Sequence, residues 1–175
     1  MRKFVIALAA APALLASPAI AVTYLSLPQV QALLFPHQAL APAFRTLTPA
    51  QMAAIRKASG EAPLSPELKA WRAADGGWLI VDQVIGKHDF ITYAVALDPA
   101  GTVRSVEIMD YRESYGGEVR DPRWRAQFVG KHPGQALRAG QEIRTISGAT
   151  LSSRHVTDGV RRLLATYAIA LAHPG

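Results

Sequence analysis

The sequence of 175 residues contains no cysteine. This absence excludes disulfide bonds, zinc sites with thiolate ligands, iron–sulfur clusters and haem attached through cysteine. Any redox chemistry of the chain must therefore come from a cofactor that does not depend on a thiol. Because it has no covalent cross-link, the folded chain is held together by its core alone.

Motifs of several nucleotide-binding, hydrolytic and metal-dependent proteins are also missing. No Gly-x-Gly-x-x-Gly pattern follows a predicted strand, residues 130–131 lack the rest of a phosphate-binding P-loop, and Ser147 stands in no Gly-x-Ser-x-Gly turn. The histidines are far apart and form no His-x-x-x-His pair, so a metal centre is not indicated. They are His37, His88, His132, His155 and His173.

Acidic residues are fewer than basic ones. The chain has 13 Asp and Glu residues against 19 Lys and Arg residues, a formal charge of +6. Because the basic residues are scattered rather than gathered in runs, we expect no binding to nucleic acid. Half of the residues are apolar, which argues against disorder and favours one domain with a substantial core.

Residues 1–21 have the pattern of a signal peptide. A basic pair at residues 2–3 precedes an apolar run at residues 4–15, and an Ala-x-Ala site allows cleavage after Ala21. The run is short and rich in alanine for a membrane span. We therefore expect export to the periplasm, with an uncleaved, membrane-associated anchor as the alternative. Cleavage would leave 17 basic and 13 acidic residues, a formal charge of +4.

Residues 22–66 are predicted to form a short helical segment and a linker. Ser26 before Leu27-Pro28 is typical of a helix start, and one apolar face is expected to include Leu33. Residues 48–51 read Thr-Pro-Ala-Gln, a capping box that begins a second helix.

The remaining residues, 67–175, predict an antiparallel sheet with packing helices, so the fold class is α+β. Strands are expected at residues 78–85, 90–97 and 103–109, and the tight turns between them indicate a meander. The strand at 90–97 is apolar on both faces, as expected for a central strand that is covered on both sides.

Two further helices are expected after the sheet. Asp121-Pro122 begins a short one, and apolar residues at helical spacing from 156 to 167 mark the last one. Asp158 and Arg162 are predicted to form a surface ion pair on this last helix.

Residues 146–153 lead into the last helix and are rich in hydroxyl groups. Gly148 favours a tight turn, and Ser152 or Ser153 is expected to cap the helix. A hydroxyl beside a helix N-terminus stands where free N–H groups and the helix dipole favour a phosphate. From composition alone, an ordinary helix cap is the alternative.

The sequence Ser147-Gly148-Ala149-Thr150 closely resembles the attachment motif of FMN-binding domains. Such domains occur in the G subunit of Rnf electron-transport complexes and the C subunit of sodium-pumping NADH:quinone oxidoreductases. The resemblance covers about residues 78–167 and implies FMN as cofactor, joined through its phosphate to Thr150. The residues that it places around this linkage are Ser147, Gly148, Ala149, Leu151 and Ser152.

A second, looser match lies in the loop after the sheet. The residues Glu113-Ser114-Tyr115-Gly116 resemble the Glu-Thr-Pro-Gly loop of the family, which lies over the isoalloxazine ring, although Tyr115 stands where proline is common. The resemblance adds these four residues to the cofactor site. Tyr111, Tyr115 and Trp124 are candidates for stacking on the ring, with packing as the alternative for each. Arg112 is a neighbouring candidate for a polar contact with the ring.

The resemblance implies a small periplasmic single-domain member of the family, with residues 67–175 as the FMN-binding domain. We expect an electron-transfer protein rather than a substrate-converting enzyme. Its implied partners are an FAD:protein FMN transferase and redox proteins, which include membrane-bound ones. A flavin-dependent reductase with its own small substrate ranks last.

The chain departs from the family pattern at Arg144, where the transferase target usually carries Asp. Because this change reverses the charge, it opens a second interpretation. The chain would then be a non-flavinylated interaction module of the same fold.

Overall fold

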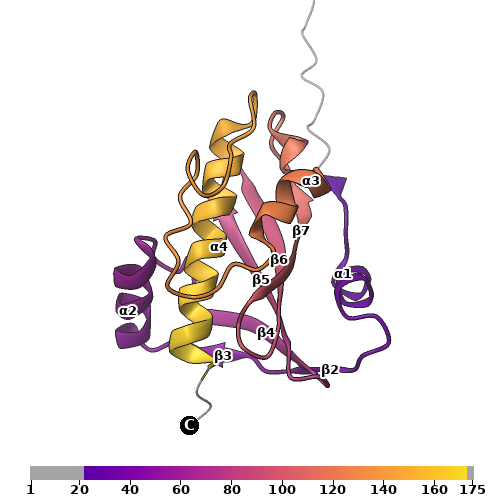
Figure 1. Ribbon diagram of the computed structural model, residues 1–175, viewed down its shortest axis with the longest axis vertical. Helices are drawn as coiled ribbons and strands as arrows, with labels where there is room; N and C mark the ends of the chain where they lie inside the picture. Colours follow the sequence, from indigo (N-terminus) through magenta and orange to yellow (C-terminus); the bar gives the residue numbers. More distant parts are fainter. Residues whose placement is uncertain (1–21, 173–175) are drawn as a thin grey trace, which may run out of the picture.

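The computed structural model describes residues 22–172 and shows an antiparallel sheet with helices packed against it (Figure 1). The predicted α+β class is confirmed. The predicted signal peptide lies outside the described residues and stays a prediction. The strands are β1 (Val22–Thr23), β2 (Leu40–Pro42), β3 (Arg45–Thr46), β4 (Glu67–Ala73), β5 (Trp78–Ile85), β6 (Phe90–Leu97) and β7 (Val103–Tyr111). The helices are α1 (Leu27–Leu34), α2 (Pro49–Ser59), α3 (Pro122–Arg125) and α4 (Thr150–Ala170), with the 3-10 turns η1 (Gly117–Arg120) and η2 (Ala126–Phe128).

The sheet has the strand order β1-β7-β6-β5-β4-β2, and β3 pairs separately with β4. Strands β4 to β7 are neighbours in chain order, which confirms the predicted meander. The N-terminal segment also contributes β1, β2 and β3 to the same sheet, which the sequence did not predict. Strands of two or three residues are too short to give an alternating pattern.

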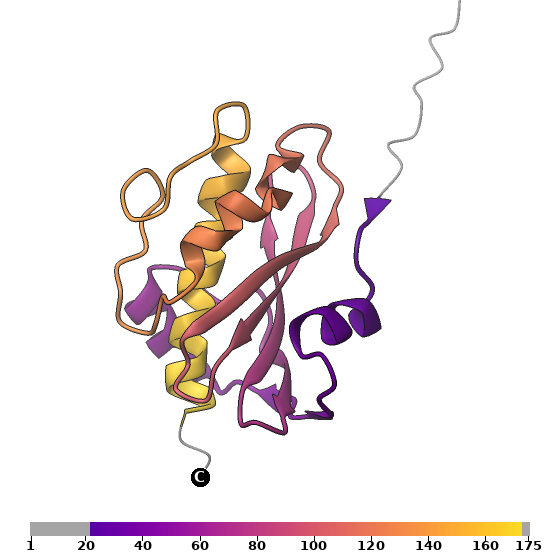
Figure 2. The ribbon, with the colours of Figure 1, turned by 45° about the vertical axis from the view of Figure 1, so that its right-hand side comes forward.

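Both faces of the central strands are buried (Figure 2). On one face, Ile80 and Tyr93 pack in the main core with the apolar side of α4. On the other face, Leu79 and Ala94 pack in a smaller core that includes Val30 of α1. Residues 90–97 are therefore apolar because both faces of this central strand are covered, as predicted.

A β-bulge near the end of β7 changes which face of the sheet its last side chains point to. Tyr93 pairs with Ile108 but Thr92 pairs with Asp110, so Met109 is the extra residue. Without the bulge, Asp110 would share a face with Ile108. With it, Tyr111 points toward α4 and joins the main core.

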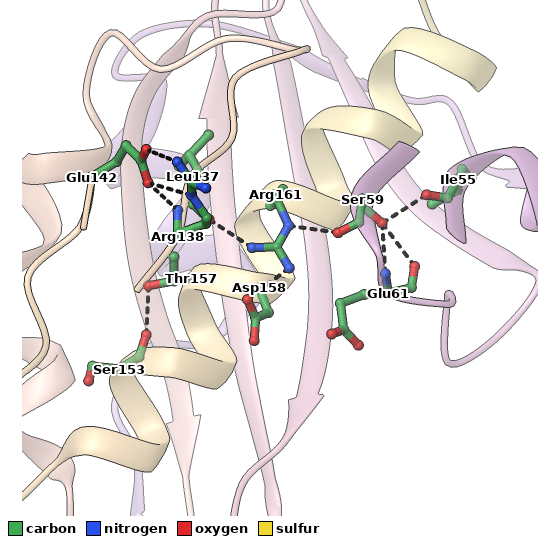
Figure 3. Close-up of polar contacts among 10 residues, drawn as sticks. All are labelled: Ile55, Ser59, Glu61, Leu137, Arg138, Glu142, Ser153, Thr157, Asp158 and Arg161. Carbon is green, nitrogen blue, oxygen red and sulfur yellow. Dashed lines mark hydrogen bonds and ion pairs between the residues drawn. The ribbon is translucent and has the colours of Figure 1, made fainter. Parts of the chain in front are cut away.

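Arg161 holds α4 to the segments on its outer side (Figure 3). Its guanidinium donates to the carbonyl oxygens of Ser59, at the end of α2, and Leu137, each at 2.7 Å, and pairs with Asp158 at 2.9 Å. The predicted pair of Asp158 with Arg162 is therefore wrong. Arg162 is buried and pairs with Asp82 of β5 at 2.7 Å, because its side of α4 faces the sheet rather than water.

The predicted helix starts are mostly confirmed. The Thr48 side chain accepts a hydrogen bond from the Gln51 N–H, and the Asp121 side chain accepts one from the Arg123 N–H. Leu33, however, is exposed rather than part of a buried face. Between residues 22 and 172 there is no helix with the length and apolarity that a membrane crossing requires.

Candidate functional site

A cavity of about 390 Å³ lies where the first turn of α4 meets two loops at one end of the sheet. Its volume is in the range of small-ligand sites. Both predicted segments line it, although they are more than thirty residues apart in sequence: residues 113–116 form one wall and residues 148–152 another. Ser147 is exposed and does not line the cavity.

The helix α4 begins three residues earlier than a cap at Ser152 would require. Gly148 has φ +83°, and the Ala149 N–H donates to the Ile146 carbonyl at 3.0 Å, so the turn ends at Ala149 and Thr150 is the first helical residue. The predicted cap at Ser152 or Ser153 is therefore wrong. Ser153 lies inside the helix, and its hydroxyl donates to the Thr150 carbonyl.

The start of α4 has the properties of an anion site. Its N-cap residue, Ala149, offers no side-chain hydrogen bond, and the first turn carries no acidic residue. The first N–H groups of a helix have no intrahelical partner and attract negative charge. The Thr150 side chain is exposed there, and its hydroxyl makes one long hydrogen bond of 3.3 Å to the Ile146 carbonyl.

Tyr111 fixes the loop wall to the helix. Its hydroxyl donates to the Tyr115 carbonyl oxygen and shares a hydrogen bond of 2.8 Å with the Ser152 hydroxyl. Gly116 fits between them with φ +93°, and a Cβ there would lie 2.5 Å from both hydroxyl oxygens. Burial raises the pKa of Tyr111, so its hydroxyl stays protonated.

Glu113 points to the turn between β5 and β6. Its Oε1 accepts hydrogen bonds from the backbone N–H groups of His88 at 2.5 Å and Asp89 at 3.0 Å. Partial burial alone would raise the pKa of Glu113, but these hydrogen bonds outweigh it and lower the pKa. Glu113 is therefore an ionised acceptor that joins two loops.

The candidates for ring contact have different surroundings. Tyr111 is buried, and so is Trp124, whose indole N–H donates to the Arg144 carbonyl at 2.7 Å. Tyr115 is 85% exposed at the cavity, so it is the aromatic side chain that a ligand can reach. Arg112 is exposed and pairs with Asp110 at 3.0 Å.

Sequence reasoning missed Lys87 and His88, which also line the cavity. Both residues lie in one of the tight turns predicted between strands, the one between residues 85 and 90, and no local motif marks them as cofactor residues. The predicted meander contained a signal for them, because the turn after β5 and the loop after β7 must lie at the same end of an antiparallel sheet. In the described part of the chain, no group of three His, Asp or Glu side chains is arranged to hold a metal ion.

Residues 86–165 match the family model of the FMN-binding domain. The chain carries an FMN-binding domain. The match begins at the β5–β6 turn and ends within α4, so it contains every residue that lines the cavity. No curated protein matches the chain.

The cavity of the FMN-binding domain fits this cofactor. The uncapped N-terminus of α4 suits a phosphate, and no atom lies within 4 Å of the place where a Cβ of Gly148 would stand. Tyr115 offers an exposed aromatic face beside them. The protein is thus a flavoprotein with FMN as its cofactor, as the resemblance implied.

Proposed function

We propose that the protein is an exported electron-transfer flavoprotein that carries FMN on Thr150 through a phosphoester bond. The observation that supports this most is the position of Thr150. It is an exposed hydroxyl at the uncapped start of a 21-residue helix and lines the cavity of the FMN-binding domain.

The linkage follows from a balanced exchange of bonds. An FAD:protein FMN transferase brings the flavin-side phosphorus of FAD to Thr150 Oγ1. The hydroxyl oxygen bonds to that phosphorus and loses its proton, while the anhydride bond breaks and AMP leaves. The α4 N–H groups and helix dipole then stabilise the phosphoester anion.

Bound FMN supplies one- or two-electron exchange, and the residues of this chain supply retention and a tuned environment. A covalent bond retains the cofactor in the periplasm, where no cytoplasmic FMN pool can replace it. We therefore propose soluble or membrane-bound redox proteins as partners, rather than a substrate of its own.

Intact-mass measurement of the exported chain tests the linkage. Expression with the transferase should add the mass of one FMN residue to the chain, and Thr150→Ala should remove this addition. Thr46→Ala, which removes an exposed threonine hydroxyl outside both the cavity and the attachment motif, is the matched control and should stay modified. An unmodified wild-type chain, or a Thr150→Ala chain that is still modified, would contradict the proposal. The same spectra give the N-terminal residue and so test cleavage after Ala21.

Arg144 supports a second candidate function, a non-flavinylated interaction module. The residue is exposed, outside the cavity, and its backbone is held by Trp124 and by Gln127. If its positive charge blocks the transferase, Arg144→Asp should convert an unmodified chain into a modified one. Equal modification of both chains would exclude this second function.

A further inference from the structure

The turn between β5 and β6 brings positive charge to the FMN cavity. Lys87 and His88 are its two central residues, and the Gly86 N–H closes it by donating to the Asp89 carbonyl at 2.7 Å. Lys87 and His88 are the basic residues among those that line the cavity, and Glu113 is the acidic one. Within residues 22–172, neither Lys87 nor His88 takes part in an ion pair.

The carboxylate of Glu113 is hydrogen-bonded to the backbone of this turn. It accepts the N–H groups of His88 and Asp89, and a Cβ on Gly86 would lie only 2.4 Å from its Oε1. Glycine at position 86 therefore allows the close approach. The loop that follows β7 thus holds the turn in place, and with it the position of Lys87 at the cavity wall.

We propose that Lys87 is a cofactor-binding residue of this FMN site and that Glu113 is a positioning residue which holds the Lys87 turn. Lys87 lines a cavity that the N-terminus of α4 also lines, so both walls favour an anion. An effect of Lys87 on the reduction potential rests on the proposed electron-transfer function. An effect of Lys87 on FMN affinity requires only that the protein binds FMN.

Elementary electrostatics gives the direction of each effect. The phosphate of FMN is anionic, and reduction adds negative charge to the flavin, so a nearby cation favours binding and favours the reduced form more than the oxidised one. Removal of the Lys87 charge should weaken FMN binding and lower the reduction potential. Removal of the Glu113 carboxylate should have the same effects indirectly, because the turn that carries Lys87 would be displaced.

The Lys87 experiment uses the full exported chain with Thr150→Ala, in which FMN binds without a covalent bond. Lys87→Gln should raise the dissociation constant for FMN about tenfold, the scale of one lost charge-assisted hydrogen bond. Lys87→Arg should restore most of the affinity. Lys57→Gln, the same charge change on α2, should leave it unchanged. In the flavinylated chain, Lys87→Gln should also lower the midpoint potential.

The outcomes separate this inference from the proposed function. Unchanged affinity and potential in Lys87→Gln would overturn the role of Lys87, and so would a chain that binds no FMN at all. A chain that binds FMN but is never modified at Thr150 would contradict only the covalent linkage and leaves the affinity test readable.

A pair of substitutions tests Glu113. Glu113→Gln keeps an oxygen acceptor for the turn, so affinity and potential should stay near those of the parent chain. Glu113→Ala should weaken FMN binding as Lys87→Gln does and should speed hydrogen exchange at the amides of residues 88 and 89. Because both substitutions act through Lys87, their effects should not add in the double variant. A shift of potential in Glu113→Gln as large as that in Glu113→Ala would overturn the positioning role, since the charge of Glu113 would then act on the flavin itself.

Discussion

Tyr111 shows how a side chain that does not line the cavity can still shape a cofactor site. Its hydroxyl joins the Tyr115 carbonyl to Ser152, which lies 41 residues after Tyr111 in sequence, so the loop wall is attached to the first turn of α4. Tyr111→Phe should destabilise the fold by about 1–2 kcal/mol, because the Tyr115 carbonyl and Ser152 lose a partner. Chemical denaturation measures this change.

Tyr115→Phe is the matched control for that prediction. It removes the same hydroxyl from a side chain that is 85% exposed, so the free energy of unfolding should change little. Equal losses in the two variants would show that the Tyr111 hydrogen bonds do not hold the loop.

Gly116 and Gly148 differ in why they must be glycine. Both have a positive φ, which costs other residues about 1–2 kcal/mol. A Cβ at Gly148 would meet no atom within 4 Å, but one at Gly116 would lie 2.5 Å from Ser152 and Tyr111. Gly116→Ala should therefore lower the melting temperature clearly more than Gly148→Ala. A larger loss in Gly148→Ala would contradict this account.

The sequence predicted most of the residues that line the cavity but not their individual roles. Tyr111 and Trp124 had been candidates for stacking on the ring, with packing as the alternative, and the structure buries both. Glu113 lines the cavity as predicted for a cofactor-site residue, and its carboxylate also accepts hydrogen bonds from backbone N–H groups of a turn. Such roles depend on which loops meet in space, and the spacing of residues within one loop does not contain that information.

The position of α4 depends on a glycine in its middle. A Cβ at Gly159 would lie 2.5 Å from Val84 Cγ1 and 2.6 Å from the Tyr93 hydroxyl, so the helix packs against the sheet with no room for a side chain. Glycine normally weakens a helix interior by about 1 kcal/mol relative to alanine. Here Gly159→Ala should instead destabilise the protein by about 1–3 kcal/mol, through overpacking.

Ala168→Gly in the same helix is the control, and it should show the ordinary loss of about 1 kcal/mol. Thermal melts of both variants measure the two effects. A more stable Gly159→Ala chain would mean that α4 moves away from the sheet at little cost.

Elements with a clear period were predicted well, and those without one were not. The capping box at Thr48 and the strands β5 and β6 agree with the structure because their signals are local. The strands β1 to β3 and the start of α4 do not follow from local signals. Pairing with β7 and β4 creates these short strands, and the Gly148 turn decides where the helix begins.

Acidic pH should unfold the whole molecule, in part because the carboxylates of two exposed ion pairs become protonated. The backbone N–H of Gly77 and the guanidinium of Arg104 lower the pKa of Asp75 to about 2, and Arg138 lowers that of Glu142 to about 2. Because both values lie below those of the unfolded chain, the stabilisation is complete above about pH 4.5 and is lost as the pH falls toward 2.

Asp75→Asn should flatten the fall of unfolding free energy between pH 5 and pH 2.5, since one of the two groups no longer titrates. Denaturant titrations across this range measure the slope. An unchanged slope would show that Asp75 has the same proton affinity in the folded and unfolded chains.

The sequence by itself determined the α+β class, the meander, the presence of the last helix and, through its resemblance to a family, FMN as the cofactor. These follow from composition, alternation and short motifs, which are local properties of a chain. Only the tertiary structure decided that Lys87 and His88 belong to the cavity, that Glu113 holds their turn and that Tyr111 faces α4. The physical reason is that strand register and the bulge at Met109 set which side chains meet, and neither is encoded within one segment.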